Sequence, residues 1–210
     1  RPPPPIAPPT LPSPVAPPTL PPPLPLAPPW PPGGAPGPPP SVAAHVNSTV
    51  GLTDAILDDA IGHIVLMPGT YEFDPNINGT CSGNRTYTSW YCINRALTIE
   101  AAEPGTVELN AKEQRRVFHL TGTGIALIGL IITGGIAVPL GPGDGVVGGG
   151  VFVEGGEASL MNCNIVRNRA VVDATSESKP NAFGGGVYVD DLGRVSLVGC
   201  NVSHNNASDG

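Results

Sequence analysis

The chain has 210 residues, and its 28 glycines and 28 prolines place it in the range where a low-complexity polypeptide is suspected. No run of about 18 apolar residues occurs, which argues against a membrane span, and an aromatic content of 5 % offers too few rings for stacking platforms. With a formal net charge of −7 and no basic run, nucleic acid is not expected as a partner.

The distribution of proline divides the chain into two regions of different composition. Residues 1–40 hold 22 of the 28 prolines and only one charge, at Arg1, so the remaining 170 residues carry −7 less +1, or −8. This distribution predicts a polyproline II arm over residues 1–32, a glycine-, proline- and alanine-rich joint over 33–44, and a folded domain over 45–210. The chain shows neither an initiating Met nor a signal peptide, so we expect a processed or excised N-terminus.

The arm contains a nine-residue repeat, APPTLPSPV from Ala7 and APPTLPPPL from Ala16. Because polyproline II has three residues per turn, nine residues return each side chain to the same face. One face is apolar, and we expect its larger residues to form a docking strip: Ile6, Val15, Leu24 and Trp30. Another face holds the hydroxyl groups, which are O-glycosylation candidates: Thr10, Ser13 and Thr19. The alternative is a disordered, semi-rigid spacer.

The segments PPPP, APPT, SPV and PPPLP between Pro2 and Pro25 resemble the hydroxyproline-rich parts of plant and algal wall glycoproteins and of algal flagellar hairs, the mastigonemes. The resemblance implies hydroxylated and glycosylated prolines. Candidates are Pro3, Pro4, Pro9, Pro18 and Pro22. The long Ser-Pro-Pro-Pro-Pro arrays of typical extensins are absent.

Residues 51–73, GLTDAILDDAIGHIVLMPGTYEF, predict a short helix with Thr53 as its N-cap, followed by a strand that ends at Pro68-Gly69. The helix is expected to cover the edge of the first strand layer. Farther on, Cys81 and Cys92 bracket an irregular loop, and in a secreted protein a disulfide would close it. Metal binding is the weaker interpretation there, because neither a His nor another Cys lies nearby.

Internal repetition is the strongest signal in the chain. Residues 148–170, GGGVFVEGGEASLMNCNIVRNRA, match residues 184–207, GGGVYVDDLGRVSLVGCNVSHNNA, with one insertion, and residues 117–137 form a weaker copy. Short β-branched runs between glycine turns, without helical periodicity, predict an all-β stack of coils, a parallel β-helix. The match places Cys163 over Cys200, as a buried thiol ladder or a disulfide, and Asn168 over Asn205, as a hydrogen-bonding ladder.

The GGGVxV...NCNxxxN pattern resembles the pectate-lyase-like superfamily of right-handed parallel β-helices over residues 45–210, and repeats of secreted adhesin-like proteins. That superfamily commonly opens with a capping helix, a strand and a PGxY turn. Many members cleave acidic polysaccharides with carboxylates on neighbouring coils, calcium and an Arg base. The corresponding candidates are Glu154 and Asp190, as a weak Ca²⁺ pair. In the earlier coil Leu120 is expected at their position. Arg115 and Arg116 are expected to lie in a polar connection.

The four histidines share no metal-ligand spacing and are expected on the surface or in turns: His45, His63, His119 and His204. Five Asn-X-Ser/Thr acceptors predict a secreted, N-glycosylated protein: Asn47, Asn78, Asn84, Asn201 and Asn206. Beyond Gly210 the pattern predicts another glycine-led coil, so we expect the domain to continue or to be covered by a neighbouring molecule.

These features favour a structural glycoprotein, without enzymatic activity or cofactor, that forms the repeating subunit of an extracellular fibre such as a flagellar hair, glycofibril or wall layer. The expected partners are other copies of the chain and covalent glycans. One alternative is a secreted polysaccharide lyase or hydrolase whose arm is a wall-anchoring linker. Another is a carbohydrate-binding or adhesin module, for which the sequence offers no aromatic platform.

Overall fold

The structure, a computed structural model, describes residues 42–76, 80, 89–139, 145–172 and 181–208. Contacts divide the chain into Arg1–Ala35 and Pro36–Gly210, and every described residue belongs to the second unit. The predicted arm, with its docking strip and its O-glycosylation candidates, lies outside the described residues. The first strand already begins at Val42, so the stretch predicted as a joint, 33–44, is too long at its C-terminal end.

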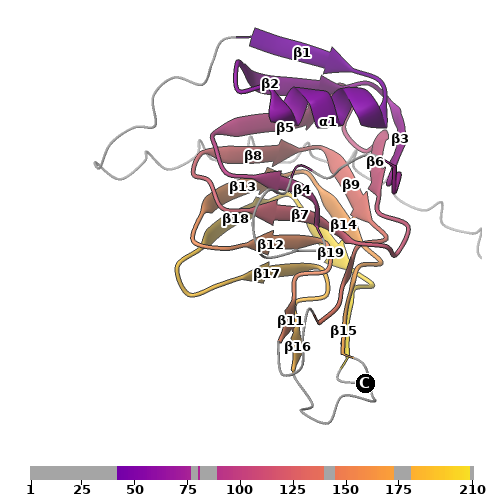
Figure 1. Cartoon of the computed structure of the whole chain (residues 1–210), viewed down its shortest axis with the longest axis vertical. Coiled ribbons are helices and arrows are strands. Elements are labelled where there is room, and N and C mark those ends of the chain that lie inside the picture. The colour runs from indigo at the N-terminus through magenta and orange to yellow at the C-terminus, as the bar shows by residue number, and fades with distance from the viewer. Residues whose placement is uncertain (1–41, 77–79, 81–88, 140–144, 173–180, 209–210) are drawn as a thin grey trace, which may run out of the picture. The chain divides into compact units, whose positions relative to one another are not determined.

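Three parallel sheets form the body of the domain, and each of the four complete coils contributes one strand to each sheet. Sheet 1 has six strands: β1 (Val42–Val46), β2 (Ile61–Leu66), β5 (Leu97–Ala101), β8 (Ile125–Ile128), β13 (Glu157–Met161) and β18 (Arg194–Val198). Sheet 2 has five: β3 (Gly69–Glu72), β6 (Val107–Asn110), β9 (Leu130–Thr133), β14 (Asn164–Val166) and β19 (Asn201–Ser203). Sheet 3 has four: β4 (Ser89–Ile93), β7 (Arg116–Leu120), β12 (Val151–Val153) and β17 (Val187–Val189). Figure 1 shows the successive coils one below another, so the predicted parallel β-helix is confirmed.

Equivalent side chains stack in ladders through the core because the strands pair in register. In sheet 1 one inward ladder reads Ala44, Ile64, Ile99, Leu127, Leu160 and Leu197. The four middle residues of this ladder are fully buried, whereas Leu197 in the last described coil is 45 % exposed. Each coil therefore buries its apolar side chains against the coils on both sides, which a single coil could not do.

Two features fix the first coil at its N-terminal end. Helix α1 (Thr49–Leu57) has Ser48 as its N-cap, whose hydroxyl accepts a hydrogen bond from Gly51 N–H at 3.2 Å. The expected cap, Thr53, is instead a buried residue within the helix, because Ser48 begins the helix one turn earlier. At the other end, the Arg95 guanidinium donates to the carbonyls of Ile56 (3.1 Å) and Asp58 (2.9 Å), a favourable position for a cation.

The turn between sheets 1 and 2 needs a left-handed backbone at the same position in three successive coils. Gly129 (φ 69°), Asn162 (φ 53°) and Gly199 (φ 64°) occupy this position. Glycine adopts this region without steric cost, and asparagine is among the side chains that tolerate it best. The conserved geometry keeps the strands on either side in register from coil to coil.

An excursion leaves the body between sheets 2 and 3 and was not expected from the repeat. Its strands also pair from coil to coil, as β10 (Ile136–Ala137), β15 (Arg169–Val171) and β20 (Asn206–Ser208), and as β11 (Val146–Val147) and β16 (Ala182–Phe183). Figure 1 shows β11, β15 and β16 projecting from the stacked coils. A small apolar cluster of its own holds the excursion together: Ala137, Val146, Ala170, Val172 and Ala182. Among the described residues, no helix has the length and apolar character needed to cross a bilayer.

Candidate functional site

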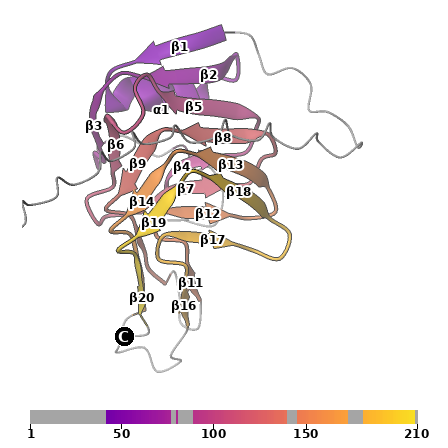
Figure 2. The ribbon, with the colours of Figure 1, turned by 180° about the vertical axis from the view of Figure 1, so that it is seen from behind.

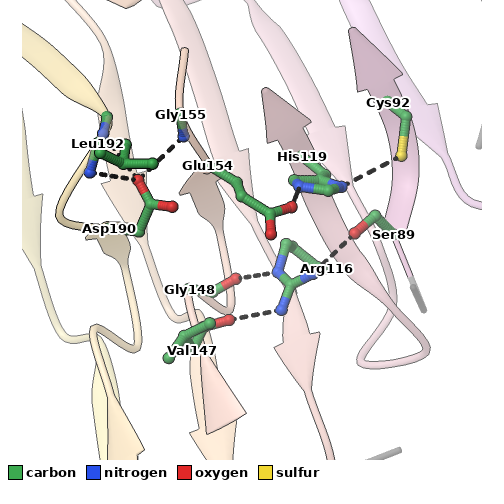
Figure 3. Close-up of polar contacts among 11 residues, drawn as sticks. Ser89, Cys92, Arg116, His119, Val147, Gly148, Glu154, Gly155, Asp190 and Leu192 are labelled. Carbon is green, nitrogen blue, oxygen red and sulfur yellow. Dashed lines mark hydrogen bonds and ion pairs between the residues drawn. The ribbon is translucent and has the colours of Figure 1, made fainter. Parts of the chain in front are cut away.

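A polar cluster lies on the outer side of sheet 3, where β7 and β12 pair (Figure 3). His119 of β7 is only 4 % exposed; its Nε2 lies 2.9 Å from Glu154 Oε2, and its ring stacks on Phe152 with centroids 5.0 Å apart. The expectation that His119 lies at the surface or in a turn is therefore wrong. Register explains its burial, because the strand pairing places His119 opposite Phe152, which in turn lies opposite Tyr188.

Arg116, at the start of β7, is also buried, with 6 % of its surface exposed. Its guanidinium donates to the carbonyl oxygens of Gly148 and Val147 and, at 3.0 Å, to Ser89 Oγ. The guanidinium carbon also lies 5.0 Å from the centroid of the Phe152 ring. The expectation that Arg116 sits in a polar connection is thus wrong: it joins sheet 3 to the chain that enters β12.

Burial and the nearby Arg116 charge lower the pKa of His119, while Glu154 partly opposes this shift. The ring is therefore neutral at neutral pH, and its contact with Glu154 is a hydrogen bond rather than an exposed catalytic pair. A general acid or base must reach the substrate proton, and His119 is enclosed by the cluster and by the rings beside it. The arrangement links neighbouring coils: the His119 side chain is enclosed, and the Glu154 side chain reaches solvent while it is engaged with His119.

Glu154 and Asp190 occupy equivalent positions on successive coils, because they follow the paired residues Val153 and Val189. Thr121, not Leu120, is the match in the earlier coil, since Leu120 pairs with Val153. Asp190 Oδ1 accepts hydrogen bonds from three backbone groups of its own turn and the neighbouring one: Gly155 N–H (2.9 Å), Leu192 N–H (3.2 Å) and Gly193 N–H (2.7 Å). Both carboxylates therefore have partners within the chain.

The predicted calcium pair gains no support from this geometry. Glu154 is engaged with His119, and Asp190 stabilises a turn. In the part of the chain that the structure describes, no group of three or more His, Cys, Asp or Glu side chains is placed to hold a metal ion. Calcium usually takes six to eight oxygen ligands, which these two positions do not assemble.

The predicted asparagine ladder is confirmed and lies in the buried turn after sheet 2. Asn168 is fully buried, and its Nδ2 donates to the carbonyl of Ile132 at 2.9 Å in the preceding coil, while its Oδ1 accepts from Gly135 N–H at 2.8 Å. From the following coil, Asn205 Oδ1 accepts from Asn168 N–H at 2.9 Å. One side chain thus joins three coils, and it satisfies buried backbone groups that would otherwise lack partners.

The two cysteines of the repeat are free thiols that stack as a ladder, so the alternative of a disulfide between Cys163 and Cys200 is not what the structure contains. Cys163 N–H donates to Cys200 Sγ at 3.4 Å, and each thiol donates to a carbonyl of the preceding coil. Burial raises the pKa of Cys163 to about 11. The Cys81–Cys92 disulfide stays a prediction, because Cys81 lies outside the described residues.

Three of the five glycosylation acceptors lie on the described surface. Asn47 precedes the N-cap of α1, Asn201 lies in β19 and Asn206 lies in β20, and all three are exposed. Asn78 and Asn84 lie outside the described residues. Of the other histidines, His45 and His204 are exposed as expected, and His63 is partly buried with its Nε2 3.2 Å from Glu100 Oε1.

A short aromatic run was missed by the sequence analysis. The ring of Phe152 lies 5.8 Å from that of Tyr188, which lies 6.3 Å from that of Phe183. Phe152 is 7 % exposed and Phe183 is 48 % exposed, so only one end of the run reaches solvent. The signal was the alignment of the glycine triplets, which places Phe152 and Tyr188 two residues after the glycines of each copy.

No protein-family model, curated protein or solved structure matches this chain.

Proposed function

We propose that this protein is a structural glycoprotein, the repeating subunit of an extracellular fibre, and that its polyproline arm holds neighbouring subunits together. The observation that carries the proposal is how the buried polar side chains of the repeats are used. Arg116, His119 and Asn168 all form hydrogen bonds to groups on other coils. These buried polar side chains therefore hold the coils in register. Such a core suits a rigid building block.

The surface of the domain is consistent with a secreted glycoprotein. Asn47, Asn201 and Asn206 are exposed acceptors on the N-terminal turn and on two different sheets, so attached glycans would not disturb the core. The arm supplies a second kind of decoration through Thr10, Ser13 and Thr19 and its prolines. At about 3.1 Å per residue the 32-residue arm reaches roughly 100 Å, far enough to contact other copies.

The repeats also support a place in the pectate-lyase-like superfamily, from which the alternative function arises: a secreted polysaccharide lyase or hydrolase. The geometry favours the structural function, because the carboxylates expected to bind calcium are occupied and Arg116 is enclosed. The double variant Glu154→Gln/Asp190→Asn separates the two. A lyase would lose activity on pectin-like substrates, whereas a fibre subunit has no such activity to lose and assembles like the wild type.

The direct experiment is electron microscopy of the purified native protein, together with intact-mass analysis. We expect regular filaments, and a mass excess from N-glycans at the five acceptors and from sugars on the arm. Dispersed monomers at concentrations where the secreted protein accumulates would overturn the proposal. A chain without any added sugar would remove its glycoprotein part.

A further inference from the structure

The outer face of sheet 1 carries side chains in straight rows, because its six strands pair in parallel register. One outward row reads His45, Val65, Glu100, Ile128, Met161 and Val198. Val65, Ile128 and Val198 lie on every second strand from β2, and we call these three residues the alternate apolar row; Met161 adds a further apolar side chain between Ile128 and Val198. In Figure 2 the strands of sheet 1 lie in front of α1, so the helix does not cover this face.

The alternate apolar row is open to a partner. Val198 is 48 % exposed, and Val65 and Ile128 are partly exposed. The one carboxylate of the full row, Glu100, lies 3.2 Å from His63 Nε2, so an apolar partner does not meet an unpaired acid there. The neighbouring outward row consists mostly of small side chains, which keep the face flat: Ala43, His63, Thr98, Ala126, Ser159 and Ser196.

The spacing of the alternate apolar row matches the repeat of a polyproline II helix. Strands in a sheet lie about 4.8 Å apart, so side chains on every second strand recur at about 9.6 Å. One polyproline II turn of three residues rises about 9.3 Å. Over the two turns that separate Val65 from Val198 the mismatch is only about 0.6 Å. An arm lying across the strands therefore places one residue of its apolar face over each member of the row.

The length of the arm repeat fits the same surface. Ile6, Val15 and Leu24 recur every nine residues, about 28 Å along polyproline II. The six strands of sheet 1 at about 4.8 Å each occupy about 29 Å. Each nine-residue repeat of the arm is thus as long as the sheet 1 face of one domain. The apolar arm face bears no charge between Ile6 and Trp30, as an aliphatic surface requires.

We infer that the outer face of sheet 1 binds the polyproline arm of a neighbouring copy of this chain, with Ile6, Val15 or Leu24 in contact with the alternate apolar row. The inference rests on the proposed fibre function and adds the docking surface to it. Burial of these aliphatic side chains supplies the attraction, and the flat face lets the arm lie straight.

Photo-crosslinking tests the docking surface in the assembled full-length chain. Benzoylphenylalanine replaces Val15, and equal amounts of ¹⁴N- and ¹⁵N-labelled protein are mixed before assembly. We expect crosslinks between differently labelled chains that map to outward residues of sheet 1. Crosslinks that map to sheet 2 or sheet 3, or that join only chains of the same label, would overturn the inference.

A matched pair of variants tests the energetics. Ile128 and Ile131 belong to the same coil and are both outward and partly buried, but Ile128 is on sheet 1 and Ile131 on sheet 2. Ile128→Glu is expected to raise the concentration needed for half-assembly roughly ten- to a hundredfold, and Ile131→Glu by less than about twofold. Equal effects, with both variants folded by circular dichroism, would refute the docking surface.

The two proposals fail in distinguishable ways. Wild-type filaments whose arm crosslinks lie elsewhere would overturn this inference and leave the fibre function intact. A wild-type chain that forms no filaments, and whose arm does not crosslink to other chains, would overturn both.

Discussion

Replacing Asn168 by Ala tests whether buried polar ladders hold the coils together. Asn168 is fully buried, and its amide serves the carbonyl of Ile132 and the N–H of Gly135 in the preceding coil. Asn168→Ala leaves both backbone groups buried without this partner, and each loss costs about 1 to 3 kcal/mol. We expect the free energy of unfolding to fall by roughly 2 to 5 kcal/mol.

Asn164→Ala is the matched control, because it removes the same side chain from the same coil. Asn164 Oδ1 accepts from the exposed Asn201 side chain at 3.0 Å, its one side-chain contact among the described residues, and water replaces that contact. Its loss should cost less than about 0.5 kcal/mol. Urea unfolding of the full-length chain, followed by the fluorescence of buried Trp90 and by circular dichroism, measures both values. Equal losses of unfolding free energy for the two variants would refute the claim that the buried Asn168 ladder stabilises the domain more than the exposed Asn164–Asn201 contact.

Other consequences can be measured on the same protein. Gly149→Ala should lower the melting temperature more than Gly155→Ala. A Cβ at Gly149 would lie 2.1 Å from the Arg169 carbonyl oxygen, whereas a Cβ at Gly155 meets no atom and only the positive φ of 65° disfavours alanine there. Equal shifts of the melting temperature would contradict this ranking. At pH 8, iodoacetamide should label the partly buried Cys200 faster than the buried Cys163, whose pKa is raised to about 11, and urea should abolish the difference. The pKa of His119 is lowered in the folded state, so on acidification the unfolded chain binds the proton first. The free energy of unfolding should therefore fall as the pH drops below the ordinary histidine pKa of 6.5. His119→Gln should flatten this pH dependence, and an unchanged slope would contradict the assignment to His119. Changing Asn47, Asn201 or Asn206 singly to Gln should each remove the mass of one N-glycan, and an unchanged mass would show that the acceptor is unused.

The stack of coils was predictable because each copy repeats the same inward positions. The aligned copies correctly place Leu160 on Leu197 and Asn168 on Asn205, since both pairs are fixed by backbone register. The excursion was not predictable, because its strands are two or three residues long and carry no pattern of their own. These short strands form because they pair with strands of the neighbouring coil, and one copy of the repeat does not reveal that pairing.

The polar cluster was missed for a different reason. Taken alone, Arg116 looks like a residue of a polar connection, because Gln114 and Arg115 precede it, and His119 looks like a surface or turn residue, because it shares no metal-ligand spacing with another histidine. Their burial depends on partners contributed by later coils, namely Glu154, Phe152 and the carbonyl of Gly148. Extending the match of Leu127 with Leu160 back to β7 without a gap would have placed His119 in the Phe152 row, which was the available signal.

The paired excursion restricts how such a chain can change its length during evolution. Extra residues in one coil leave an unpaired backbone edge unless the neighbouring coil carries a matching insertion, as β10, β15 and β20 do here. Lengthening therefore has to occur in adjacent repeats together, most simply by duplication of a repeat that already carries the insert. In the three later coils the corner between sheets 1 and 2 offers less freedom, because at most one residue separates its left-handed residue from the next strand. Variation among descendants of this chain should accordingly gather at one corner of the coil, in blocks of consecutive repeats.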